Sequence, residues 1–66
     1  MNIIPMLMNA EYAIRGIHGE IHEDELESNV SDLLTDLMHL CENRGFDFLN
    51  CLELAKRHYI KEKTDE

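Results

Sequence analysis

The stretch "SDLLTDLMHLCENRGFDF" (31–48) is the most informative about the fold, because its pattern is that of the end of one helix, a turn and the start of another. Leucines and Cys41 recur at three- and four-residue spacing before "NRG", which is the pattern of an amphipathic helix. Gly45 suits the position after a helix, where the backbone takes a positive φ. Asp47 is a good N-cap for the next helix. The stretch therefore predicts a helical hairpin.

The hairpin extends in both directions along the chain. Its first helix is expected over about 24–43, with the acidic run "EDELE" (23–27) at the positive end of the helix dipole. Its second helix is expected over about 47–62, where Phe46 and Cys51 hold the positions of a hydrophobic staple. The polar tail 63–66 is expected to fray. The inward arc of the first helix consists of Leu26, Val30, Leu33, Leu34, Leu37, Leu40 and Cys41.

A further helix is expected over about 3–17, with Asn2 as its N-cap and Pro5 in its first turn, where a missing N–H does little harm. Its apolar residues recur on one face, as in an amphipathic helix. Two glycines in "RGIHGEIH" (15–22) then break the pattern, which predicts a linker over 18–23. The fold class is all-α: a single domain made of a helix, a Gly-broken linker and an α-hairpin.

Sixty-six residues bury only a small core. Five apolar residues have no obvious place inside a three-helix monomer, and small domains often gain stability by self-association. We therefore expect a homo-oligomer, most simply a dimer, that completes the fold. The expected oligomer or partner surface consists of Met8, Tyr12, Leu49, Leu54 and Ile60.

The net charge of −8, from 14 acidic and 6 basic residues, argues against binding to nucleic acid or to an anionic membrane surface. A basic protein partner is compatible with it. No signal peptide and no stretch of about 18 apolar residues is present, and two cysteines are too few for a disulfide framework. These features predict a cytoplasmic protein with reduced thiols, and no motif predicts a cofactor.

Asp32, Asp36 and His39 fall within about 60° on a helix, because their spacing is i, i+4, i+7. Two carboxylates and an imidazole so placed can bind a divalent metal or act as acid and base. However, they lie opposite the apolar arc, on the same side as Asn29, so we expect a solvated face. A metal there would need ligands from a second chain. His18 and His22 have zinc-ligand spacing only if the linker is helical.

The candidate ligands for an anionic nucleotide between neighbouring protomers are Arg44, Arg57 and His58. The alternative is that these cations only interact with the negative C-terminal ends of the helix dipoles. Cys41 and Cys51 lie near facing ends of the hairpin and could approach each other, although free cysteines usually serve as small buried hydrophobes. His39 points away from Cys41, and His58 lies two turns from Cys51. No nucleophile–base pair, and hence no enzyme, is therefore expected.

The segment 31–62 contains the patterns D-L-L-x-D-L-M-H-x-C, G-x-D-F and A-x-x-H-Y, carried by Asp32 to Cys41, Gly45 to Phe48 and Ala55 to Tyr59. In this it resembles small uncharacterised proteins of bacteriophages and other mobile elements. The resemblance implies expression in the cytoplasm of a bacterial host, and it implies no activity. The first 25 residues do not share it.

Two function classes remain open from the sequence. The first is a non-enzymatic interaction protein, such as a phage-encoded modulator or inhibitor of a host protein. The second is a binder of a metal or an anionic nucleotide, with sites between protomers. A metal-dependent hydrolase built on Asp32, Asp36 and His39 is a more distant third.

Overall fold

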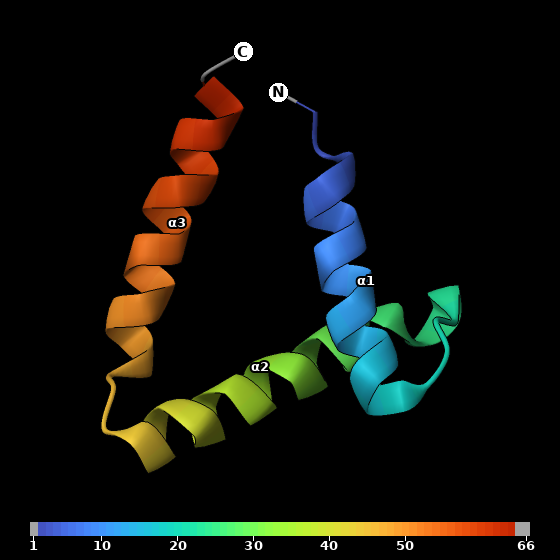
Figure 1. The fold of residues 1–66 in the computed structure, drawn as a ribbon, viewed down its shortest axis with the longest axis horizontal. Helices are drawn as coiled ribbons and strands as arrows, with labels where there is room; N and C mark the ends of the chain where they lie inside the picture. The colour runs from blue at the N-terminus through green and yellow to red at the C-terminus, as the bar shows by residue number, and fades with distance from the viewer. Residues whose placement is uncertain (1, 65–66) are drawn as a thin grey trace. The chain divides into compact units, whose positions relative to one another are not determined.

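The structure, a computed structural model, describes residues 2–64 and consists of helices joined by short connections (Figure 1). In chain order these are α1 (Ile4–His18), the single 3₁₀ turn η1 (Glu23–Glu25), α2 (Leu26–Arg44) and α3 (Phe48–Thr64). The prediction of an all-α unit with three α-helices is confirmed for the described residues. In the part of the chain that the structure describes, no helix is both long enough and apolar enough to cross a membrane.

The start of α1 shows how Asn2 and Pro5 act together. The Asn2 side-chain oxygen accepts a hydrogen bond from the Ile4 N–H at 3.0 Å, although Ile3 is the residue in the N-cap position. Pro5 lies in the first turn, where its lack of an N–H costs no helical hydrogen bond. Asn2 therefore satisfies a free N–H at the helix end, but one position earlier than a regular cap.

The end of α1 and the start of α2 differ from expectation by a residue or two. His18 still belongs to α1, and Gly19, with φ of 82°, ends that helix and donates its N–H to the Arg15 carbonyl at 2.8 Å. The 3₁₀ turn η1 then precedes α2 and consists wholly of acidic residues. The connection between α1 and η1 is thus shorter than the linker expected over 18–23.

The turn between α2 and α3 is held by backbone hydrogen bonds. The Phe46 N–H donates to the Cys41 carbonyl at 2.8 Å, and the Gly45 N–H donates to the Glu42 carbonyl at 3.3 Å. With Gly45 at φ of 78°, these two bonds form a Schellman motif. The Asp47 side chain then accepts the Leu49 N–H at 3.0 Å, which caps α3. Both ends of the turn are thus fixed by local chemistry.

α3 continues two residues beyond the end that the sequence predicted. Lys63 lies in the helix with its ammonium 5.1 Å from the centre of the Tyr59 ring, and the Thr64 hydroxyl donates to the Lys61 carbonyl at 3.1 Å. A cation over an aromatic face stabilises this last turn. Of the tail expected to fray, residues 65 and 66 lie outside the described residues.

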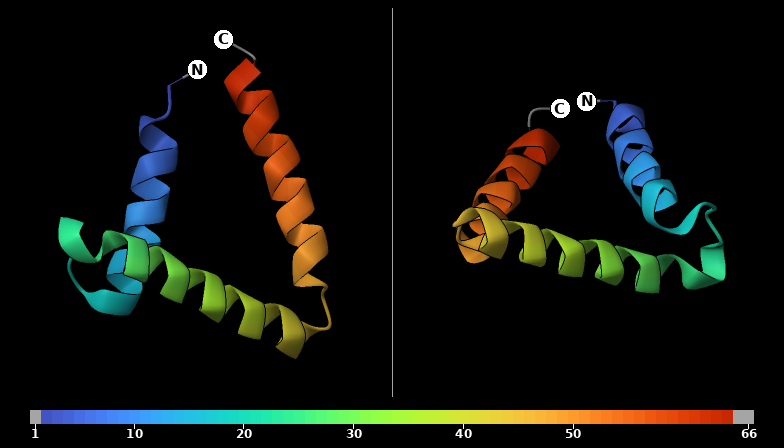
Figure 2. Two further views of the ribbon diagram at one scale, coloured as in Figure 1. Left: turned by 180° about the vertical axis from the view of Figure 1, so that it is seen from behind. Right: turned by 60° about the horizontal axis from the view of Figure 1, so that its bottom comes forward.

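The contacts divide the chain into two compact units. One unit is Asn2–Leu37, in which α1 lies across the first half of α2 (Figures 1 and 2); the other begins at Met38. Of the residues that the structure describes, only Ile14, 3% exposed, and Asn29, 5% exposed, are buried. The burial is concentrated where α1 meets α2.

The burial of Asn29 corrects the sequence analysis, which placed this residue on the solvated face of α2. The short connection after α1 brings the last turns of α1 over the first turns of α2. There Leu26, Asn29 and Leu33 share a face at i, i+3 and i+7, and the two leucines are half-buried. Val30 and Leu34, which the helical wheel placed on the inward arc, remain exposed.

The unit that begins at Met38 has no buried residue between positions 38 and 64. Phe48 and Leu52, expected on the inward stripe of α3, are half-buried, and Cys41 is half-buried as well. Phe46, expected to staple the turn through its side chain, is 66% exposed. The Phe46 side chain therefore does not staple the turn, which is held by its backbone hydrogen bonds and by the Asp47 cap.

Candidate functional site

Asp32, Asp36 and His39 are all exposed on α2. The Asp32 carboxylate lies 3.4 Å from His18 Nε2, at the end of α1, which makes an ion pair when His18 is protonated. Sequence reasoning missed this pair, because the two residues belong to different helices. Between residues 2 and 64, no three His, Cys, Asp or Glu side chains lie close enough together to hold a metal ion.

His18 and His22 do not form the pair that zinc-ligand spacing suggested. His18 contacts Asp32, whereas His22 Nε2 lies 3.1 Å from the Glu20 carboxylate within the connection. Gly19 ends the helix between them, so the i, i+4 geometry is lost. Each imidazole is instead placed beside a single carboxylate, and such exposed pairs contribute about 0.2–1 kcal/mol.

The candidate anion ligands Arg44, Arg57 and His58 are spread along the second unit. Arg44 ends α2, whereas Arg57 lies about 14 Å along α3 from its first residue, at 1.5 Å per residue. Arg57 borders an open hollow that Asn50, Glu53 and Leu54 also line. The Glu53 carboxylate in that hollow, 3.6 Å from the Lys56 ammonium, works against an anionic ligand.

Cys41 lies before the turn between α2 and α3, and Cys51 lies after it. Both are free thiols, Cys41 half-buried and Cys51 exposed. Burial, and next to it the Cys51 thiol, raise the pKa of the Cys41 thiol; the Asp47 carboxylate acts in the same direction.

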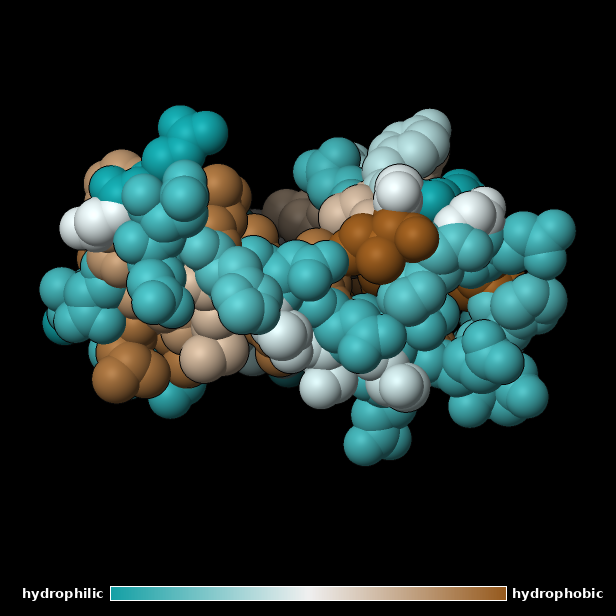
Figure 3. All heavy atoms as spheres, turned by 90° about the horizontal axis from the view of Figure 1, so that it is seen from below, coloured by the Kyte–Doolittle hydropathy of each residue, from teal (hydrophilic) through white to brown (hydrophobic). Residues whose placement is uncertain are grey.

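The most extensive feature is exposed apolar surface. We use the name association surface for the five residues expected from the sequence, of which two lie on the unit Asn2–Leu37 and three on the unit that begins at Met38. All five are exposed: Met8, Tyr12, Leu49, Leu54 and Ile60. Leu49 is 67% exposed, the largest value among the exposed large hydrophobic residues. On the face drawn in Figure 3, hydrophobic side chains are exposed between polar side chains.

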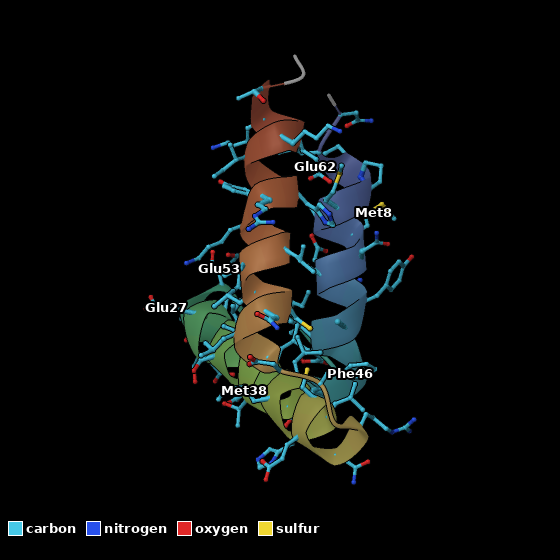
Figure 4. The ribbon with its side chains drawn as sticks, turned by 90° about the vertical axis from the view of Figure 1, so that its left-hand side faces the viewer. Met8, Glu27, Met38, Phe46, Glu53 and Glu62 are labelled. Atoms are coloured by element: carbon cyan, nitrogen blue, oxygen red, sulfur yellow. The ribbon has the colours of Figure 1, made fainter. Side chains whose placement is uncertain are left out.

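Further exposed hydrophobes lie outside the association surface, and the sequence analysis had assigned several of them to the interior. Met38 and Phe46 project from the ribbon, as Met8 does (Figure 4). The helical wheel found their apolar character but could not tell whether another element covers them. On α2 the exposed group consists of Val30, Leu34, Leu37, Met38 and Leu40.

Comparison of the chain with protein-family models, with curated proteins and with solved structures found no match.

Proposed function

We propose that this chain is a small acidic interaction protein without enzymatic activity, with which a bacteriophage or mobile element modulates or inhibits a protein in the cytoplasm of its bacterial host. The observation that carries the proposal is the association surface, whose five large apolar side chains all reach solvent. Burying one such side chain contributes about 1.5–3 kcal/mol. A surface of this kind is typical of proteins that act by binding other proteins.

Self-association is the first step of the proposal. Each compact unit is shorter than about 40 residues, a size below which a hydrophobic core seldom suffices without crosslinks, metals or oligomerisation. Ile14 is the only buried hydrophobic residue between positions 2 and 64. A second copy of the chain, by covering the association surface, supplies the burial that the units lack.

The net charge of −8 supports a basic host protein as the partner. A field of one sign accelerates the encounter with a surface of opposite sign and disfavours acidic partners and nucleic acid. Four acidic residues in η1 and the first turn of α2 concentrate part of this charge: Glu23, Asp24, Glu25 and Glu27. In this proposal apolar contact supplies affinity, and charge selects the partner.

Two single substitutions at neighbouring positions test self-association, and each adds one positive charge. Leu49→Lys and Asn50→Lys both place a lysine in the first turn of α3, so their effects on the helix dipole are matched. We expect Leu49→Lys to weaken self-association at least tenfold in sedimentation equilibrium, and Asn50→Lys to leave it within about threefold of the wild type. A wild-type chain that stays a folded monomer up to high concentration would overturn the self-association step.

A ligand screen tests the alternative class. Thermal unfolding of the wild-type chain is measured with divalent metal salts and with nucleoside di- and triphosphates, because a specific ligand raises the midpoint by mass action. The interaction proposal expects no shift. A saturable shift that Arg57→Ala or His39→Ala abolishes would replace the proposal by a ligand-binding function.

A further inference from the structure

An apolar face of α2 lies beside the residues of that helix that pack against α1. Val30, Leu34 and Leu37 are spaced i, i+4 and i+7, so their side chains share one side of the helix over about 10 Å. They are 42%, 43% and 39% exposed, and all three belong to the unit Asn2–Leu37. We call these three residues the docking face, and they share no residue with the association surface.

The chain around the docking face is acidic. Residues 20–43 contain eight acidic side chains and no lysine or arginine. Glu27 lies three residues before Val30 and therefore on the same side of α2. Together with the three acidic residues of η1 it places four carboxylates just before the docking face. The ion pairs within residues 2–64 do not include any of these four, so their charge is available to cations of another molecule.

The combination of apolar face and negative charge selects one kind of occupant. A second copy brings its own charge of −8 to this acidic segment and is repelled. A basic amphipathic helix is attracted, and its apolar side chains at i, i+4 and i+7 match the spacing of the docking face. Apolar contact then supplies affinity, and lysine or arginine beside the carboxylates supplies the selection of the partner.

We propose that the docking face binds an amphipathic helix of a basic protein, with the apolar side of that helix on Val30, Leu34 and Leu37 and its cations beside residues 23–27. The inference rests on the proposed function, because it names the face that takes the basic partner. It leaves the association surface to a second copy of the chain. The two contacts respond to salt in opposite directions, because screening weakens the attraction of the basic helix and also weakens the repulsion between copies.

The probe for the test is a synthetic peptide of about 18 residues, made of leucine and lysine with all leucines on one face of the helix. In isothermal titration calorimetry we expect one peptide per wild-type chain, and an affinity that falls at least tenfold between about 0.05 and 0.5 M salt. A peptide of the same composition with scattered leucines, and one with glutamate in place of lysine, should each bind at least tenfold more weakly. No binding of the probe, or equal binding of either control peptide, would overturn the proposal.

Two matched leucine variants test the apolar contact. Leu34→Gln should weaken binding of the probe at least tenfold, because it removes an apolar side chain from the middle of the docking face. Leu7→Gln makes the same change at a leucine of α1 that is 48% exposed, and it should leave the affinity within about threefold of the wild type. Far-UV circular dichroism checks that both variants keep their helices. Equal losses in the two variants would overturn the proposal.

Two double variants of equal charge test the contribution of the carboxylates. Glu23→Gln with Glu27→Gln should weaken binding at least threefold at about 0.05 M salt. Glu42→Gln with Glu62→Gln removes the same number of charges away from the docking face and should have a smaller effect. The same loss in both double variants would show that the peptide responds only to the net charge of the chain, and it would overturn the proposal.

Crosslinking of the wild-type chain decides the proposal even if a variant fails to fold. A photoreactive group among the leucines of the probe should attach within residues 30–37, which lie in the tryptic peptide Gly16–Arg44 and are resolved by tandem mass spectrometry. Attachment mainly to α1 or α3 would overturn the proposal. Sedimentation of the same chain without the probe separates this inference from the proposed self-association. A folded monomer that crosslinks at the docking face overturns only the self-association step, whereas self-association without such crosslinks overturns only the docking of the basic helix.

Discussion

At the scale of single residues, Asp47 makes the most testable contribution. Its carboxylate accepts the Leu49 N–H at 3.0 Å and caps α3. Asp47→Ala should lower the free energy of unfolding by about 1 kcal/mol, measured by urea unfolding followed with far-UV circular dichroism. Asp47→Ser keeps an acceptor at the cap and should lose less than half of that amount. Equal losses in the two variants would show that the cap does not act through this hydrogen bond.

Replacing either of two glycines by alanine should change the stability of the chain in opposite directions. Gly45 has φ of 78°, and an added Cβ would meet nothing within 4 Å, so Gly45→Ala should cost about 1 kcal/mol through backbone strain alone. Gly16 lies inside α1, and a Cβ added there would also meet nothing within 4 Å. Gly16→Ala should therefore stabilise the chain by about 0.4–1 kcal/mol, because alanine lowers the conformational entropy of the unfolded chain. Urea unfolding of both variants measures this contrast, and losses in both would contradict it.

The raised pKa of Cys41 predicts a dependence on pH. Because the fold favours the protonated thiol, the stabilising contribution is present below the ordinary pKa and is lost as the pH rises through the raised value. The rate of Cys41 alkylation should accordingly reach half its maximum at a higher pH in the native chain than in the urea-unfolded chain. Peptide-resolved mass spectrometry after iodoacetamide pulses measures both profiles. Coincident profiles would contradict the prediction.

At the scale of elements, the docking of α1 on the first half of α2 depends on Ile14. Removal of this buried side chain in Ile14→Ala should cost about 2 kcal/mol or more, because it leaves a cavity where α1 packs on α2. Ile4→Ala, at an exposed position on the same helix, should change stability by about 0.5 kcal/mol or less. Thermal unfolding followed by circular dichroism measures both. Similar effects of the two variants would mean that α1 is held by another contact.

At the scale of the whole molecule, apolar surface and net charge oppose each other in self-association. Two copies that each carry a charge of −8 repel, whereas a basic partner is attracted. Raising the salt concentration from about 0.05 to 0.5 M should therefore strengthen self-association several-fold, because salt screens the repulsion. Sedimentation velocity measures this, with the Leu49→Lys variant as the control that associates weakly at both concentrations. Self-association that weakens with salt would point to contacts between opposite charges instead.

The sequence predicted the helices and the hairpin turn because their signals are local. The apolar periodicity of α2, the glycine after it and the Asp47 cap each act within a few residues, and the structure reproduces all three. The candidate sites could be placed only partly. The wheel placed Asp32, Asp36 and His39 on an exposed side, but it could not find His18 beside Asp32, because that contact joins two helices.

The all-α class, the start and end of each helix to within two residues, and the acidic charge could be read from the sequence, since these follow from composition and short-range chemistry. The burial of Asn29 and the exposure of Val30 and Leu34 could not, because they depend on where α1 packs on α2. A helical wheel ranks the faces of one helix by hydrophobicity. Which face is buried depends on the connection that carries the next helix to it.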